Sequence, residues 1–163
     1  MKKSIIFLVL IICLASCTST VDSDLSPTTA QSDNGCTVEN INSFIESAND
    51  VENKLYHLSQ QAVMKISMDK DLWPIVEEMF SVESDADQIS SSACTLTTKA
   101  ALTSYMETFV QVYAGLYAES TGARTDLPPS TSDNYDLAAS KYDYYQTKMD
   151  ELRNLLIEKC SCK

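Results

Sequence analysis

The stretch INSFIESANDVENKLYHLSQQA, residues 41–62, decides the fold that this sequence predicts. Its apolar side chains recur at alternating steps of three and four residues, which places them on one face of an α-helix. Seven successive a and d positions of a heptad are filled by Ile41, Phe44, Ala48, Val51, Leu55, Leu58 and Ala62. Because Thr37 can cap its start, the stretch predicts a first helix over residues 38–68.

The same periodicity recurs in three later segments. These predict helices over residues 72–90, 94–119 and 133–160. Asp71 occupies an N-cap position with Pro74 in the first turn behind it, and Gly122 suits a left-handed helix end. Ser132 or Asp133 is expected to cap the last helix. No segment alternates with a period of two, so we expect no strands.

Four cysteines of the helical region select the order of the helices. If residues 72–90 were a loop, Cys36 would lie one helix of about 45 Å away from Cys94 and Cys160. A disulfide needs Cα atoms within about 7 Å. Four helices in up-down-up-down order bring these three cysteines and Cys162 to one end. The sequence therefore predicts an all-α, disulfide-stabilised antiparallel four-helix bundle over residues 36–163.

The same geometry predicts the pairing of the cysteines. In a square bundle the first and third helices both neighbour the fourth, so we expect Cys36 and Cys94 each to pair with one of Cys160 and Cys162. Either combination satisfies this expectation. Zinc fits less well, because Cys160-Ser161-Cys162 is one residue short of a CxxC motif and the single histidine, His57, is far away in the chain.

The N-terminal residues predict export from the cytoplasm. Two lysines precede the apolar run 5–14 and small residues follow it, as in a cleaved signal peptide over residues 1–16. The run is shorter than the ~20 residues of a membrane-spanning helix. Residues 14–17, Leu-Ala-Ser-Cys, resemble a bacterial lipobox, in which Cys17 would carry a lipid, although ordinary signal cleavage fits the same residues. Residues 17–35 are polar and predict a flexible tether.

Charge excludes several kinds of partner. The formal net charge is −11 at pH 7, and removing residues 1–16, which contain two lysines, lowers it to about −13. Such an acidic surface repels nucleic acid and anionic membranes. We therefore expect no nucleic-acid partner, and contact with a membrane through a lipid on Cys17 alone. The expected location is extracytoplasmic, either secreted or lipid-anchored at the cell surface.

Motifs that carry chemistry are missing from the sequence. There is no nucleophile elbow, phosphate-binding loop or HExxH motif, and His57 lacks an adjacent catalytic partner. Neighbouring carboxylates such as Glu77 and Glu78 point in different directions around a helix, and the inward positions are apolar. We therefore expect no enzymatic activity, no metal and no cofactor.

The tyrosines are predicted to divide between core and surface. Tyr105, Tyr142 and Tyr145 fall on apolar stripes and are expected in the core. Tyr135 and Tyr144 are candidates for partner contact, because tyrosine joins apolar area to a polar tip. Ordinary packing is the alternative interpretation of both.

The leading hypothesis is an exported, non-catalytic interaction module that binds another protein. One alternative is a carrier that holds a small apolar ligand between its helices. Methionines would form the adaptable lining of that carrier: Met64, Met68, Met79, Met106 and Met149. A second alternative is a lipid-anchored, bacterial-type surface lipoprotein with a structural role.

Overall fold

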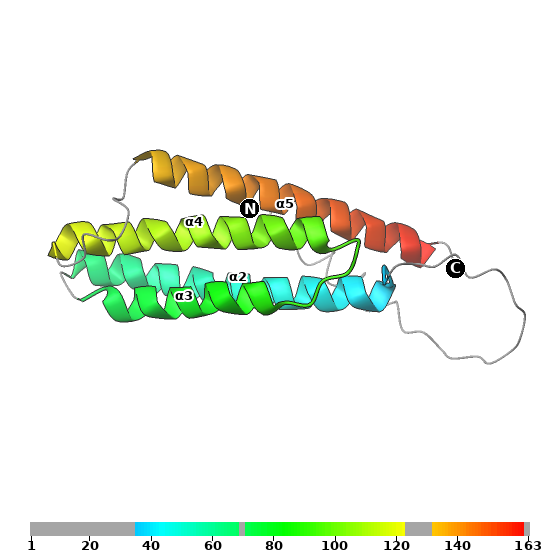
Figure 1. The fold of residues 1–163 in the computed structure, drawn as a ribbon, viewed down its shortest axis with the longest axis horizontal. Helices are drawn as coiled ribbons and strands as arrows, with labels where there is room; N and C mark the ends of the chain where they lie inside the picture. Colours follow the sequence, from blue (N-terminus) through cyan, green and yellow to red (C-terminus); the bar gives the residue numbers. More distant parts are fainter. Residues whose placement is uncertain (1–34, 69–70, 123–131, 162–163) are drawn as a thin grey trace, which may run out of the picture.

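The computed structural model describes residues 35–68, 71–122 and 132–161 (Figure 1). Within these residues the chain forms four helices and no strand, which confirms the predicted all-α class. The helices are α2 (Val38–Ser67), α3 (Trp73–Gln88), α4 (Leu96–Thr121) and α5 (Ser132–Ser161). Every helix end lies within two residues of the predicted end. The predicted signal peptide, Cys17 and all of the predicted tether except Gly35 lie outside the described residues.

Capping residues expected from the sequence hold the helix ends. Thr37 Oγ1 accepts a hydrogen bond from the backbone N–H of Asn40 at 3.2 Å, as an N-cap side chain does. The Asp71 carboxylate accepts one from the N–H of Trp73 at 3.0 Å, acting from one position before the backbone N-cap of α3. Gly122 ends α4 in the left-handed conformation with φ of 61°, which glycine adopts without a steric penalty.

The junction between α3 and α4 is a tight turn closed by side chains. The backbone N–H of Ser92 donates to Thr95 Oγ1 at 2.8 Å, and the backbone carbonyl of Ser92 accepts the N–H of Thr95 at 3.0 Å. Because residues 92–95 form this turn, α4 begins two residues later than predicted. The Lys99 ammonium donates to the carbonyls of Asp87 and Ile89, both at 2.7 Å. These carbonyls end α3, so Lys99 on α4 caps the C-terminus of the preceding helix.

Each helix packs on two others: α2 on α3 and α5, and α4 on α3 and α5. The rings of Trp73, at the start of α3, and Tyr117, near the end of α4, lie 5.0 Å apart. Together with the contact of Lys99 to Ile89, this pair shows that α3 and α4 run in opposite directions. Figure 1 shows the four helices side by side along one long axis.

Helix α5 also runs opposite to α4. Thr98 near the start of α4 donates to the carbonyl of Lys148 at 3.4 Å, and Thr108 accepts from Lys141 Nζ at 2.7 Å. Figure 1 shows α5 inclined to the other helices, with its first turns leaning away from them. The expectation that Tyr142 is a core residue is wrong, because 37% of this residue is exposed.

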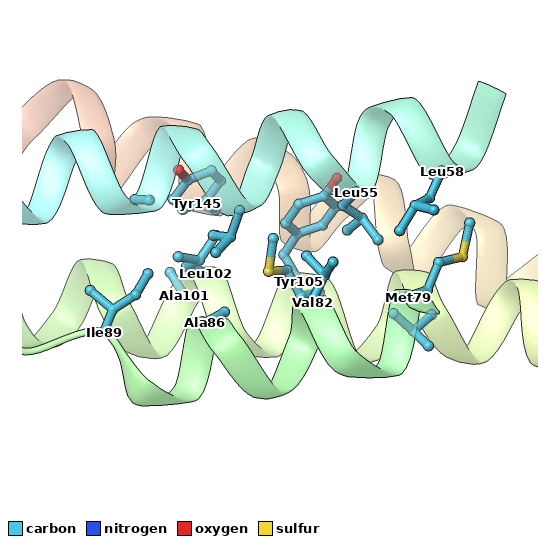
Figure 2. Close-up of a cluster of buried hydrophobic side chains, with 14 of the residues drawn as sticks. Leu55, Leu58, Met79, Val82, Ala86, Ile89, Ala101, Leu102, Tyr105 and Tyr145 are labelled. Atoms are coloured by element: carbon cyan, nitrogen blue, oxygen red, sulfur yellow. The ribbon is translucent and has the colours of Figure 1, made fainter. Parts of the chain in front are cut away.

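The core lies on the predicted stripes. All seven heptad positions of α2 are buried, as are the apolar positions that repeat at the same spacing in the next segment: Leu72, Ile75, Met79, Val82, Ala86 and Ile89. Figure 2 shows core side chains, among them Leu55 of α2, Met79 of α3 and Tyr105 of α4, meeting between the helices. Fully burying a side chain of leucine size contributes about 2 kcal/mol, so these stripes dominate the stability of the fold.

The disulfide joins Cys36 to Cys94, whose Cα atoms are 5.5 Å apart. The prediction that each of these cysteines pairs with Cys160 or Cys162 is therefore wrong. Cys36 and Cys94 both precede the first residue of their helices, so irregular backbone carries them off the helix axes and across the end of the bundle. Cys160 is half-buried against the core, and Cys162 lies outside the described residues.

We call the end of the bundle with Cys36 and Cys94 the disulfide end, and the opposite one the far end. The start of α2, the start of α4 and the end of α5 lie at the disulfide end (Figure 1). In the part of the chain that the structure describes, no helix is both long enough and apolar enough to span a bilayer.

Candidate functional site

The two tyrosines predicted to contact a partner lie on α5 and are both exposed. Tyr135 and Tyr144 are nine residues apart, about two and a half helical turns, so they point to opposite sides of the helix. Tyr144 lies on the α4 side, where Lys148 Nζ is 5.5 Å from its ring centroid and the Lys148 carbonyl bonds Thr98 of α4. The structure therefore does not bring these two tyrosines together on one surface.

Tyr135 shares its side of α5 with Tyr142, seven residues further on. This side faces α2, because the neighbouring Gln146 donates from Nε2 to Glu52 Oε1 at 3.1 Å. On α2, Tyr56 and Val63 follow Glu52 at spacings of four and eleven residues and share its side of the helix. Tyr56 is 60% exposed and Val63 is 55% exposed. Large apolar groups from both helices thus remain open to solvent.

We define the α2–α5 face as these side chains together with the polar residues between them. It comprises Asn49, Asn53, Tyr56, Gln60 and Val63 of α2, and Tyr135, Tyr142 and Gln146 of α5. All eight residues are neutral, and Glu52, the carboxylate that lies among them on α2, accepts hydrogen bonds from Tyr145 and Gln146. Protein interfaces are depleted of charge and enriched in tyrosine, and amides supply adaptable hydrogen bonds. The α2–α5 face has this composition.

An aromatic cluster supports the face from α4. The rings of Tyr105, Phe109 and Tyr113 follow one another at centroid distances of 5.7 and 5.2 Å. Tyr105 also contacts Tyr142 at 5.0 Å and lies parallel to Tyr145 at 6.0 Å, with an interplanar angle of 7°. Such ring pairs add to the energy of simple burial, so the cluster fixes α5 against α4. The exposed Tyr142 therefore packs on buried aromatic rings.

A polar contact between α2 and α5 is one that the sequence did not reveal. The hydroxyl of the fully buried Tyr145 donates to Glu52 Oε2 at 3.2 Å. We expected inward positions to be apolar, and Glu52 lies at the edge of the α2 stripe, where a solvated carboxylate is the ordinary reading. A glutamate at a stripe edge opposite a core tyrosine is a signal for such a pair, but the sequence does not state which residues face each other.

Burial raises the pKa of Tyr145, and the charge of Glu52 raises it further. The pKa of Tyr105 is raised in the same way, first by burial and then by Glu52. A tyrosine with a raised pKa keeps its proton at neutral pH and donates a hydrogen bond. In this site the hydroxyl of Tyr145 therefore positions α5 against α2.

A groove of about 560 Å³ lies between α2 and the end of α3, at the disulfide end. Ten of its thirteen lining residues are polar, mostly serines and amides, whereas a carrier of an apolar ligand would need an apolar lining. Lys54 and Asp50, both lining residues, form an ion pair at 2.9 Å. Of the methionines considered for that carrier, Met79, Met106 and Met149 are fully buried in the core, while Met64 and Met68 are exposed.

His57 is exposed, and its ring lies edge-on to Tyr56 at 5.9 Å. Among residues 35–68, 71–122 and 132–161, no three His, Cys, Asp or Glu side chains gather in a way that could hold a metal ion. No protein family, no curated protein and no solved structure matches this chain.

Proposed function

We propose that this chain is an exported, non-catalytic helical module that binds another protein through the α2–α5 face. The observation that carries the proposal is the exposure of Tyr56, Val63, Tyr135 and Tyr142 beside neutral amide side chains, with the Glu52 carboxylate among them held by hydrogen bonds from Tyr145 and Gln146. Large exposed apolar groups ringed by neutral hydrogen-bonding side chains are typical of protein-binding surfaces. The aromatic cluster behind the face holds it in shape before a partner arrives, which lowers the entropic cost of binding.

The proposal includes an up-down-up-down order of the four helices. The contacts of Trp73 with Tyr117, and of Thr98 with Lys148, support antiparallel neighbours. The short connections between α2 and α3 and between α3 and α4 support it as well. In this order the α2–α5 face occupies the half of the bundle towards the far end, away from Cys36 and Cys94.

The proposal also places the protein outside the cytoplasm, secreted or anchored at the surface by a lipid on Cys17. The signal-like N-terminus supports export, and a disulfide between Cys36 and Cys94 is compatible with an oxidising compartment. Intact mass of the purified mature protein tests this part. A chain that begins at Cys17 with an added diacylglycerol supports the anchor, a chain cleaved without lipid supports secretion, and an uncleaved chain contradicts export.

Site-specific photo-cross-linking tests the binding face. A benzophenone amino acid replaces Val63 or Tyr135 in cells that produce the protein, and Leu96, an exposed apolar residue of α4 near the disulfide, serves as the matched control site. We expect a discrete cross-linked band from Val63 and Tyr135 and none from Leu96. Equal bands from all three sites, or none from the first two, would contradict the proposed face.

A further inference from the structure

We propose that the partner segment bound by the α2–α5 face is an amphipathic α-helix whose apolar stripe is flanked by lysine or arginine. This inference rests on the protein-binding function proposed above and specifies the chemistry of the partner. Its evidence is a local gap in the packing of α5 on α2, a seven-residue spacing on both helices, and a row of carboxylates beside that spacing.

The gap is local because the same side of α2 is covered at one end and open at the other. Ile45, Tyr56 and Val63 share one side of α2, since their spacings of eleven and seven residues complete nearly whole helical turns. Ile45, nearer the disulfide end, is 8% exposed, whereas Tyr56 and Val63 are each more than half exposed. Figure 1 shows the first half of α5 inclined away from the other helices, and the exposure of Tyr56 and Val63 shows that this part of α2 is open to solvent. The open strip therefore runs lengthwise between two helices.

The spacing of the exposed groups matches a third helix. Tyr56 and Val63 are seven residues apart on α2, and Tyr135 and Tyr142 are seven residues apart on α5. Seven residues of a helix span about 10.5 Å, so a helix running along the strip meets both pairs with side chains at positions i and i+7. Helices that bind in grooves present their anchors at such spacings.

The charges beside the strip select a basic partner. Asp136 and Asp143 directly follow Tyr135 and Tyr142, so these exposed carboxylates form their own seven-residue row along the outer border of the face. Opposite charges flanking an apolar helical stripe set partner choice. A second copy of this chain would bring like charges together, in a molecule of net charge −11, so a basic helix from a different protein fits better.

A designed helical peptide of about 20 residues, with leucine at the a and d positions and lysine at the flanking positions, is the probe. Two control peptides carry glutamate in place of lysine, or the same leucines and lysines in scrambled order. With the oxidised protein we expect the first peptide to bind at least about tenfold more tightly than either control, as measured by fluorescence anisotropy. Amide chemical shifts should change on the second half of α2 and the first half of α5.

Variants of the protein separate the face from general attraction to an acidic surface. Val63→Asp should weaken binding of the lysine peptide about tenfold or more, while Leu96→Asp, at a residue 59% exposed, should leave it unchanged. The pair Asp136→Asn and Asp143→Asn should weaken binding and reduce its salt dependence. The pair Glu77→Gln and Glu78→Gln on α3 removes the same amount of charge and should leave both the binding and its salt dependence unchanged. All these side chains are exposed, so the variants are expected to fold, and circular dichroism checks this.

Several results would overturn the inference. Equal affinity for the ordered and scrambled lysine peptides would mean that charge alone drives binding. Equal loss from Val63→Asp and Leu96→Asp would mean that the α2–α5 face is not the site. Failure of the lysine peptide while Val63 still cross-links to a partner would refute the basic helix and leave the proposed function standing. Failure of both would refute the proposed function as well.

Discussion

Glu83 on α3 holds a partly buried carboxyl group near two other carboxylates. Its Oε2 atom is buried without a hydrogen-bond partner among the described residues, and burial raises its pKa, with further increases from the charges of Glu107 and Asp87. A carboxyl group with a raised pKa destabilises the fold when it is ionised, and this penalty is lost as the pH falls through that pKa.

We therefore predict that Glu83→Gln raises the free energy of unfolding at neutral pH. The gain should be less than about 1 kcal/mol, since the side chain is partly solvated. It should shrink as the pH is lowered towards about 4, where the wild-type carboxyl group is protonated. Thermal unfolding of both proteins across this range measures the difference, with Glu77→Gln as an exposed control. A gain that does not change with pH would contradict the explanation.

The raised pKa of Tyr145 leads to a second prediction, which concerns the stability of the fold at high pH. Its pKa is raised, mainly by burial, so the folded state holds this proton more tightly than the unfolded chain does. The resulting stability is complete below the unfolded pKa of about 10 and is lost as the pH rises above it. Tyr145→Phe removes the hydrogen bond to Glu52 and should cost about 1–2 kcal/mol at neutral pH.

The same variant should lose less stability than wild type between about pH 9 and pH 11, because a phenylalanine cannot ionise. Urea unfolding at several pH values measures both effects, and Tyr56→Phe on the exposed part of α2 serves as the control. Parallel curves for wild type and Tyr145→Phe above pH 9 would show that Tyr145 does not carry the alkaline loss.

At the scale of an element, the C-terminus of α3 depends on a side chain from the next helix. Lys99 donates to the carbonyls of Asp87 and Ile89, which have no partners inside α3. We predict that Lys99→Met costs about 1 kcal/mol and speeds amide hydrogen exchange in the last turn of α3. Lys54→Met, which removes an exposed ion pair with Asp50, should cost less. Unchanged exchange in α3 would refute the capping role.

Local features of the elements were predictable, whereas features that depend on how elements meet were not. The heptad from Ile41 to Ala62 and the caps at Thr37 and Gly122 follow from spacing and backbone preference along one segment. The exposure of Tyr142 depends on how α5 packs against its neighbours. A periodic pattern identifies the inward side of a helix but not the angle at which the helix crosses its neighbours.

The candidate site follows the same division. Tyr135 was found because an exposed tyrosine is itself a signal, but Tyr56 and Val63 were missed because the sequence does not show where α5 stops covering α2. Glu52 was missed because its partner, Tyr145, is ninety-three residues away. The pairing of Cys36 failed for a related reason: the prediction kept each cysteine on its helix axis, whereas both partners precede their helices.

At the scale of the whole molecule, the disulfide closes a loop of 58 residues that contains α2 and α3. Loop closure of this length predicts a stabilisation of about 4 kcal/mol, through the reduced entropy of the unfolded chain. We predict that Cys36→Ser and Cys94→Ser each lower the free energy of unfolding by about this amount, and that combining them adds little. Urea unfolding of the two single variants and the double variant tests this.

Peptide mapping of the non-reduced protein provides the direct check on the pairing. It should yield a fragment that links Cys36 to Cys94. A fragment that links Cys94 to Cys160 or Cys162 would contradict the structure and restore the pairing expected from the sequence. Strongly additive losses from the two single variants would show that each cysteine has a different partner.

The bridge from Cys36 to Cys94 also sets the path of mechanical force through the protein. A pull between the chain termini passes from Cys36 directly to Cys94 and then along α4 and α5, so it bypasses the loop that holds α2 and α3. The 58 residues of that loop represent a hidden contour length of about 200 Å, at ~3.5 Å per extended residue. Under load, only the segments outside the closed loop lengthen, among them α4 and α5, and this reserve of length is released only after a reductant has cut the bridge.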